Sequence, residues 1–175
     1  KSAKKKKAKG FIGTSVSESS KYFNLNSGLG TMPHALVGYA GSTIDSVRMF
    51  HATFPKENIV ILPDYFGKEI SDSVSVCKKY NQLVKKSKVL VRLDTPSGRY
   101  VEGLDLAKSY NILEKYAPQS ISEYRSEEEL KHLVGPGVSA AAIWYLRSKL
   151  NNEGFSKVKI IASSGFTNNK CKAMA

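Results

Sequence analysis

Short apolar runs recur along this 175-residue chain, and most of them are followed by a segment with helical periodicity. The runs are rich in aliphatic and β-branched residues, as expected of parallel strands that are buried on both faces. They cover residues 11–15, 29–31, 58–64, 89–94 and 158–165. From Thr31 to Asp64 is 33 residues and from Asp64 to Asp94 is 30, the length of a strand-helix-strand unit. The sequence therefore predicts an α/β fold with a parallel sheet.

Residues with hydroxyl or carboxylate side chains stand where these runs end. Thr31, Asp64, Asp94 and Ser163 are examples from four different runs. The carboxyl ends of parallel strands lie at one edge, and both α/β barrels and open α/β sheets build their sites there. We therefore expect the functional site at this edge.

Three longer segments have apolar residues at three- and four-residue spacings. Residues 34–50, 70–84 and 137–150 are each predicted to form a helix, and this spacing assigns Cys77 and Trp144 to packing. Residues 97–136 interrupt the rhythm and are predicted to be an insertion between the last two strands, either a lid or a surface decoration. Within it, Ser126 followed by Glu129 indicates a capped helix start.

His34 follows one of the polar strand ends, in the stretch Gly-Thr-Met-Pro-His-Ala-Leu at residues 30–36. Pro33 favours a helix start, so we expect His34 in the first turn, close to unpaired backbone N–H groups. Those groups and the helix dipole attract anions, and an unprotonated imidazole nitrogen is a nucleophile suited to phosphate. The alternative is a structural histidine bonded to a backbone carbonyl.

The formal charge of +12 is concentrated at one end, because six lysines lie within residues 1–9. Such a block indicates a basic helix end, a solvated segment or a nucleic-acid contact. The sequence lacks an RNP pattern, a zinc knuckle and a helix-turn-helix signature. We therefore expect no nucleic-acid partner, and a non-catalytic nucleic-acid-binding protein is the alternative hypothesis.

The cysteines and the hydropathy bear on location. Cys77 and Cys171 have no metal-ligand spacing, and no run of about 18 apolar residues is present. We expect reduced thiols, a cytoplasmic protein and no membrane partner.

At several of these positions the chain resembles nicotinate phosphoribosyltransferases, which are grouped with the nicotinamide and quinolinate enzymes as type II phosphoribosyltransferases. The matching pieces are residues 13–15, 30–36, 91–96, 154–155, 158–160 and 163–166, in the family's order. The resemblance covers most of residues 10–175. Its strongest parts are Gly-Thr-Met-Pro-His-Ala-Leu at 30–36 and Val-Arg-Leu-Asp-Thr-Pro at 91–96.

The resemblance implies that residues 10–175 form a portion of a TIM-like α/β barrel, the catalytic domain. Five predicted strands fall short of the eight that a barrel needs in roughly 250 residues. We therefore expect a piece of a longer enzyme. The family also implies a homodimer.

The activity implied by the resemblance is NAD biosynthesis from nicotinate. Nicotinate and phosphoribosyl pyrophosphate would give nicotinate mononucleotide and pyrophosphate, with ATP as co-substrate through a phosphorylated histidine placed at His34. Mg²⁺ would be carried on the pyrophosphate through substrate oxygens and water, with no metal site on the protein. Nicotinamide or quinolinate as the base, or a phosphate-binding lyase, are alternatives.

The resemblance also implies roles for individual residues. Asp94 matches a carboxylate on the ribose side, and Asp64 matches an acidic residue that orients His34 or holds hydroxyls. The context of Asp64, Pro-Asp-Tyr-Phe-Gly, departs from the family's commoner Asp-Thr-Tyr/Phe-Asp. Either aspartate could instead cap a helix, and Arg92 could form a salt bridge rather than grip nicotinate or phosphate. The remaining substrate contacts implied are Thr31, Thr95, Ser163, Ser164 and Gly165.

Overall fold

The computed structural model describes residues 17–26 and 32–174 of a chain that divides into two compact units, residues 1–31 and 32–175. In the first unit, α2 (Ser17–Ser20) leads into a 3-10 helix, η1 (Lys21–Phe23). The predicted strands at 11–15 and 29–31 and the basic segment 1–9 lie outside the described residues. The second unit carries the predicted site.

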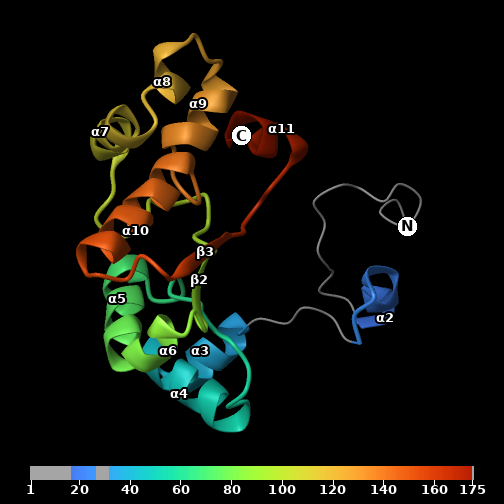
Figure 1. Cartoon of the computed structure of the whole chain (residues 1–175). Coiled ribbons are helices and arrows are strands. Elements are labelled where there is room, and N and C mark those ends of the chain that lie inside the picture. The colour runs from blue at the N-terminus through green and yellow to red at the C-terminus, as the bar shows by residue number, and fades with distance from the viewer. Residues whose placement is uncertain (1–16, 27–31, 175) are drawn as a thin grey trace. The chain divides into compact units, whose positions relative to one another are not determined.

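A parallel sheet of three strands forms the centre of the second unit, in the order β1-β2-β3 (Figure 1). The strands are β1 (Ile59–Ile61), β2 (Val89–Leu93) and β3 (Lys159–Ala162). Val91 of β2 lies opposite Ile61 on one side and Ile160 on the other. All three lie within predicted runs, so the α/β class and the parallel pairing are confirmed.

The expected portion of a TIM-like barrel is wrong. The described strands are short and form an open sheet, in which β1 and β3 each pair only with β2. A barrel closes by pairing its first strand with its last, over eight strands in all. The repeat length and the polar strand ends misled the prediction, because open sheets and barrels share both features.

Two of the three predicted helices are interrupted in the structure. Residues 34–50 form α3 (His34–Ala40) and α4 (Thr43–Thr53), because Gly41 adopts a left-handed φ of 75° and ends α3. Ser42 then caps α4 by accepting from the Asp45 amide at 3.1 Å. Residues 70–84 are divided between α5 (Glu69–Lys79) and α6 (Asn81–Lys85). In residues 17–26 and 32–174, no helix has the length and apolar character needed to cross a bilayer.

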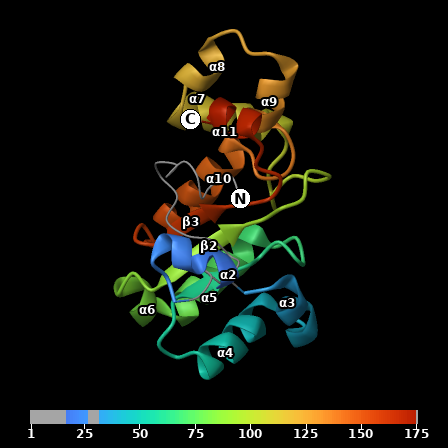
Figure 2. The ribbon, with the colours of Figure 1, turned by 90° about the vertical axis from the view of Figure 1, so that its right-hand side faces the viewer.

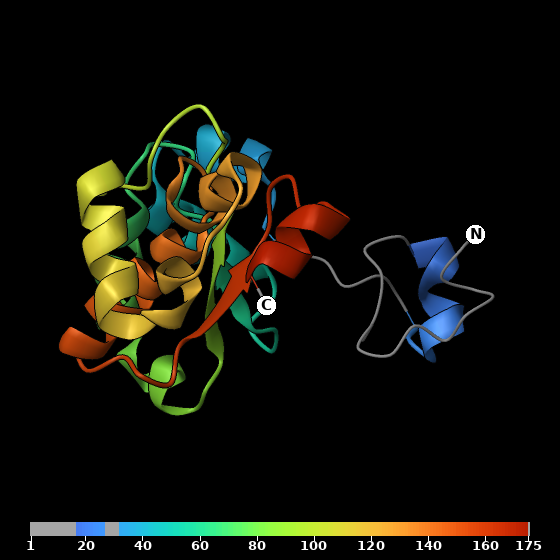
Figure 3. The same cartoon turned by 90° about the horizontal axis from the view of Figure 1, so that it is seen from above.

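The predicted insertion forms three helices, α7 (Leu106–Tyr116), α8 (Gln119–Ser122) and α9 (Glu127–Val134). The Ser126–Glu129 capping box is confirmed at the start of α9. Helices α7 and α9 both pack on α10 (Ala140–Asn152), and α7 is the yellow helix in Figure 3. Side chains from these three helices form a second apolar cluster, comprising Leu113, Leu133, Val134 and Ala141. The insertion is therefore a packed part of the unit.

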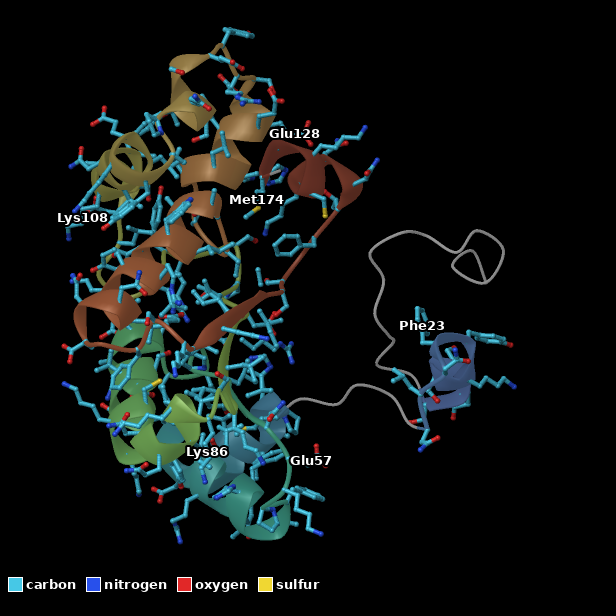
Figure 4. The ribbon with its side chains drawn as sticks, in the orientation of Figure 1. Phe23, Glu57, Lys86, Lys108, Glu128 and Met174 are labelled. Carbon is cyan, nitrogen blue, oxygen red and sulfur yellow. The ribbon has the colours of Figure 1, made fainter. Side chains whose placement is uncertain are left out.

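The last described helix, α11 (Asn168–Met174), lies against α9 (Figure 2). Asn169 donates a hydrogen bond from Nδ2 to Oε1 of Glu128 at 3.3 Å, and Figure 4 labels Glu128 on α9. This contact links the segment after β3 to the inserted helices.

The main core is made of aliphatic side chains from the sheet and the helices around it. Members that are fully excluded from solvent include Val37, Val47, Ile59, Ile61, Val76, Val91, Leu93 and Leu146. Cys77 is buried among them as predicted, and burial raises the pKa of its thiol to about 12. Trp144 also packs, as predicted, but near the surface: it stacks on Tyr116 of α7 with ring centroids 5.5 Å apart and is 38% exposed.

Leu146→Ala should lower the free energy of unfolding by about 2–5 kcal/mol, because it removes buried methyl groups and leaves a cavity between α10 and the core. Urea denaturation followed by circular dichroism measures the change. Leu106→Ala is the matched control, since Leu106 is 51% exposed and its loss should cost under about 1 kcal/mol. Equal losses in the two variants would contradict the assigned packing of α10.

Candidate functional site

Five of the predicted site residues meet at the carboxyl ends of the three strands, and one of them, Arg92, belongs to β2 itself. Asp64 lies just after β1, Asp94 directly after β2 and Ser163 directly after β3, while His34 begins α3. The Ser163 amide donates to the Leu93 carbonyl at 2.9 Å, so strand pairing continues to the site itself. The sheet edge predicted from the sequence is therefore the place where these side chains meet.

His34 contacts the carboxylate of Asp64. Its Nε2 lies 2.9 Å from Oδ2 and 3.2 Å from Oδ1, and the Asp64 side chain is almost fully buried. Because an ionised carboxylate only accepts, we assign the proton to Nε2. Nδ1 makes no hydrogen bond within the described part of the chain. The alternative of a histidine bonded to a backbone carbonyl is therefore wrong.

The backbone on both sides explains this contact. Pro33 is extended, with φ −83° and ψ 152°, and the helix begins at His34, so the expected place in the first turn is confirmed. After β1, Gly67 adopts a φ of 69° and donates its amide to the Asp64 carbonyl at 3.0 Å. The charged groups nearest to the His34 ring are the carboxylates of Asp64 and Asp94. Helix α3 has only seven residues, so its dipole is a lesser influence on the ring.

Asp94 forms a second cluster beside the first. Its Oδ2 accepts from Arg92 Nη2 at 2.5 Å, and its Oδ1 accepts from the Ser163 hydroxyl at 2.6 Å. Arg92 Nε in turn donates to Ser163 Oγ at 3.0 Å. Asp94 Oδ2 also lies 3.8 Å from His34 Nε2, which is too long for a hydrogen bond but close enough for electrostatic attraction.

The structure decides between several of the alternatives left by the sequence. Neither aspartate caps a helix, because Lys68 occupies the N-cap of α5 and Asp105 that of α7. The salt-bridge alternative for Arg92 is present, in its contact with Asp94. A grip on nicotinate or phosphate by Arg92 stays a prediction.

Ser164 and Gly165 form a sharp turn after β3. Both have a left-handed backbone, with φ of 76° and 61°, and the chain then enters α11. Lys170 Nζ donates to the Ser164 carbonyl at 3.0 Å and lies 4.4 Å from the centre of the Phe166 ring. Burial lowers the pKa of Lys170. A phosphate cradle at Ser163, Ser164 and Gly165 stays a prediction.

Two predicted substrate contacts remain outside this arrangement. Thr31 lies outside the described residues. Thr95 is fully buried and donates its hydroxyl to Glu69 Oε1 at 2.8 Å, so its side chain is engaged inside the protein and is not presented to a substrate. The buried location of Thr95 could not be read from its place after a strand.

Three residues that sequence reasoning missed lie around His34 and Asp64. The Tyr65 ring is centred 6.4 Å from the His34 ring, and its hydroxyl lies so close to Gly38 that a Cβ there would be 2.7 Å away. Arg99 donates to the Asp64 carbonyl, and Glu69 accepts from Arg99. Glu69 could have been found from the sequence, because it is an acidic residue at the start of a predicted helix. No motif or spacing indicated Arg99.

The described residues do not form a metal site. Among them, no three His, Cys, Asp or Glu side chains are arranged to hold an ion. Mg²⁺ carried on the pyrophosphate, as the resemblance implies, stays a prediction. Comparisons with protein-family models, with curated proteins and with solved structures found no match to this chain.

Asp94→Asn should lower the free energy of unfolding by about 1–3 kcal/mol, because Arg92 and Ser163 lose a charged acceptor in a largely buried cluster. Thermal or urea unfolding measures it. Glu153→Gln is the control, because Glu153 pairs with Lys78 at 2.7 Å on the exposed surface, where a pair contributes about 0–1 kcal/mol. If both variants lost the same small amount, the Asp94 cluster would not be a structural unit.

Proposed function

We propose that this chain carries the phosphohistidine site of a phosphoribosyltransferase that joins nicotinate to phosphoribosyl pyrophosphate, with ATP as phosphoryl donor. One observation carries the proposal: His34 Nε2 is held by Asp64 at 2.9 Å while a second carboxylate, Asp94, lies 3.8 Å away. The resemblance of residues 30–36 and 91–96 to the family supports the same assignment of His34 and Asp94.

The first step is phosphoryl transfer from ATP to His34. The Nδ1 lone pair forms a bond to the γ-phosphorus, the bond from that phosphorus to the bridging oxygen breaks, and ADP leaves with the electron pair. The ring gains positive charge while Nε2 keeps its proton. Asp64 faces that N–H, so its carboxylate holds the ring in one orientation and stabilises the charge that forms.

The second step is transfer of the phosphoribosyl group. The bond from the anomeric carbon to pyrophosphate breaks with its electrons on oxygen, and the pyridine nitrogen of nicotinate forms the new bond. Water then attacks the phosphorus of the phosphohistidine, the bond from phosphorus to Nδ1 breaks with its electrons on nitrogen, and inorganic phosphate leaves. The ribose becomes cation-like as pyrophosphate leaves, so a fixed carboxylate beside it lowers the barrier. Asp94 suits this role because Arg92 and Ser163 hold its two oxygens in place.

The alternatives gain less support from the described residues. The alternative of a non-catalytic nucleic-acid-binding protein was motivated by the lysines of residues 1–9, which lie outside them. Nicotinamide or quinolinate would use the same two steps, so a panel of the three bases identifies the substrate.

The purified protein should form nicotinate mononucleotide from nicotinate and phosphoribosyl pyrophosphate, and should take up an acid-labile, base-stable phosphoryl group from γ-labelled ATP. His34→Ala should abolish that label, while His51→Ala, at another of the three histidines, should retain it. Asp64→Asn should slow labelling by about 10- to 100-fold, because the ring loses its fixed orientation. Peptide mass spectrometry locates the label.

Two outcomes would contradict the proposal. Absence of mononucleotide with all three bases would remove the transferase assignment. Label on His51 or His132, or label that survives His34→Ala, would remove the phosphohistidine assignment.

A further inference from the structure

Glu69, the first residue of α5, carries a carboxylate that is completely excluded from solvent. A buried charge is costly unless it is paired and hydrogen-bonded. Here the carboxylate has three donors from one loop, the segment that follows β2. Thr95 Oγ1 and Arg99 Nη2 reach Oε1 at 2.8 and 2.6 Å, and the Glu102 amide reaches Oε2 at 3.1 Å.

The same nitrogen of Arg99 connects this buried charge to the candidate site. Nη2 carries two hydrogens, and besides Glu69 it donates to the Asp64 carbonyl at 2.7 Å. The Asp64 carbonyl accepts a further bond from the Gly67 amide at 3.0 Å, so its backbone is fixed from two sides. The Asp64 side chain is the group that holds His34.

Glu69 also fixes the second carboxylate of the site. Thr95, whose hydroxyl bonds to Glu69, is the residue directly after Asp94. One buried carboxylate thus anchors the backbone at Asp64 through Arg99 and the backbone at Asp94 through Thr95. Among the described residues, neither Glu69 nor Arg99 makes a hydrogen bond or ion pair to the His34 ring, so any effect on the ring passes through the aspartates.

Hydrogen bonds from α5 back to Glu102 also hold Glu69 in place. The Glu102 carboxylate accepts from the amides of Ile70 and Ser71, both at 2.8 Å, at the start of α5. Glu69 in turn accepts from the Glu102 amide. These reciprocal bonds hold the start of α5 to the loop after β2, so Glu69 itself has a fixed position.

We propose that Glu69 and Arg99 are positioning residues for the His34 site, which set the separation of Asp64 and Asp94 and thereby the orientation of the imidazole. The inference rests on the proposed function for its kinetic consequence, because positioning serves phosphoryl transfer to His34. Its structural consequence, the fixed His34–Asp64 contact, is measurable without any reaction.

The test replaces Arg99 by Met, which keeps the length of the stem and removes the bonds to Glu69 and to the Asp64 carbonyl, together with one from Nη1 to the neighbouring Tyr100 carbonyl. The ring ¹⁵N shifts of His34, assigned by their loss in His34→Ala, should move toward those of a histidine free in solution. Labelling of His34 by γ-labelled ATP should slow by about 10- to 100-fold, with KM for ATP changed less than about 2-fold. Arg99→Lys should recover part of the rate, since an ammonium can donate to both acceptors.

Arg48→Met is the matched control. Arg48 forms an exposed pair with Asp45 at 3.1 Å within α4, so both the ¹⁵N shifts and the labelling should equal those of the unaltered protein. Circular dichroism establishes that each variant folds. If Arg99→Met does not fold, Arg99→Gln is measured in the same way, because its shorter amide cannot bridge the two acceptors.

The outcomes separate the two proposals. If the unaltered protein takes up no phosphoryl group, the proposed function fails, and a shift of the His34 nitrogens in the Arg99 variant still supports positioning. If those nitrogens keep their shifts in the folded Arg99 variant, the positioning role is overturned, whatever the labelling shows.

Discussion

The parallel pairing of β1, β2 and β3 is the constraint on which the rest of the second unit depends. Parallel strands end at the same edge, so residues 30 or 69 positions apart in the sequence become neighbours there, as Asp64, Asp94 and Ser163 do. The hydrogen bond from the Ser163 amide to the Leu93 carbonyl carries this order past the last residue of β3. Backbone pairing thus places Asp64, Asp94 and Ser163 at one edge, and hydrogen bonds between side chains, such as that from Ser163 to Asp94, complete the site.

The sequence predicted the elements that are defined by local patterns. The three described strands were predicted because each is a short aliphatic run, and the start of α9 because Ser126 and Glu129 have the spacing of a capping box. The break between α3 and α4 was missed, since apolar spacing continues across Gly41 and the left-handed φ is a property of the folded backbone. The barrel was wrong because closure depends on long-range pairing that no local pattern reports.

The candidate site was likewise predicted only in part, where local patterns indicated it. His34, Asp64, Asp94 and Ser163 were predicted to meet because all follow strand ends, and the structure brings them together. Thr95 follows a strand end as well, yet it faces the interior and bonds to Glu69. The direction of a side chain after a strand depends on the loop that follows, and that loop is held by Arg99, which lies in no recognisable pattern.

The close approach of Tyr65 to Gly38 has a consequence for variation in this part of the protein. The Cβ of any other residue at position 38 would lie 2.7 Å from the Tyr65 hydroxyl, so a substitution there requires the Tyr65 ring to move. That ring is the aromatic neighbour of the His34 imidazole. Because Gly38 has no Cβ, the Tyr65 ring can lie against this two-turn helix and beside the imidazole. Even a methyl group at position 38 would therefore remove the aromatic neighbour of His34.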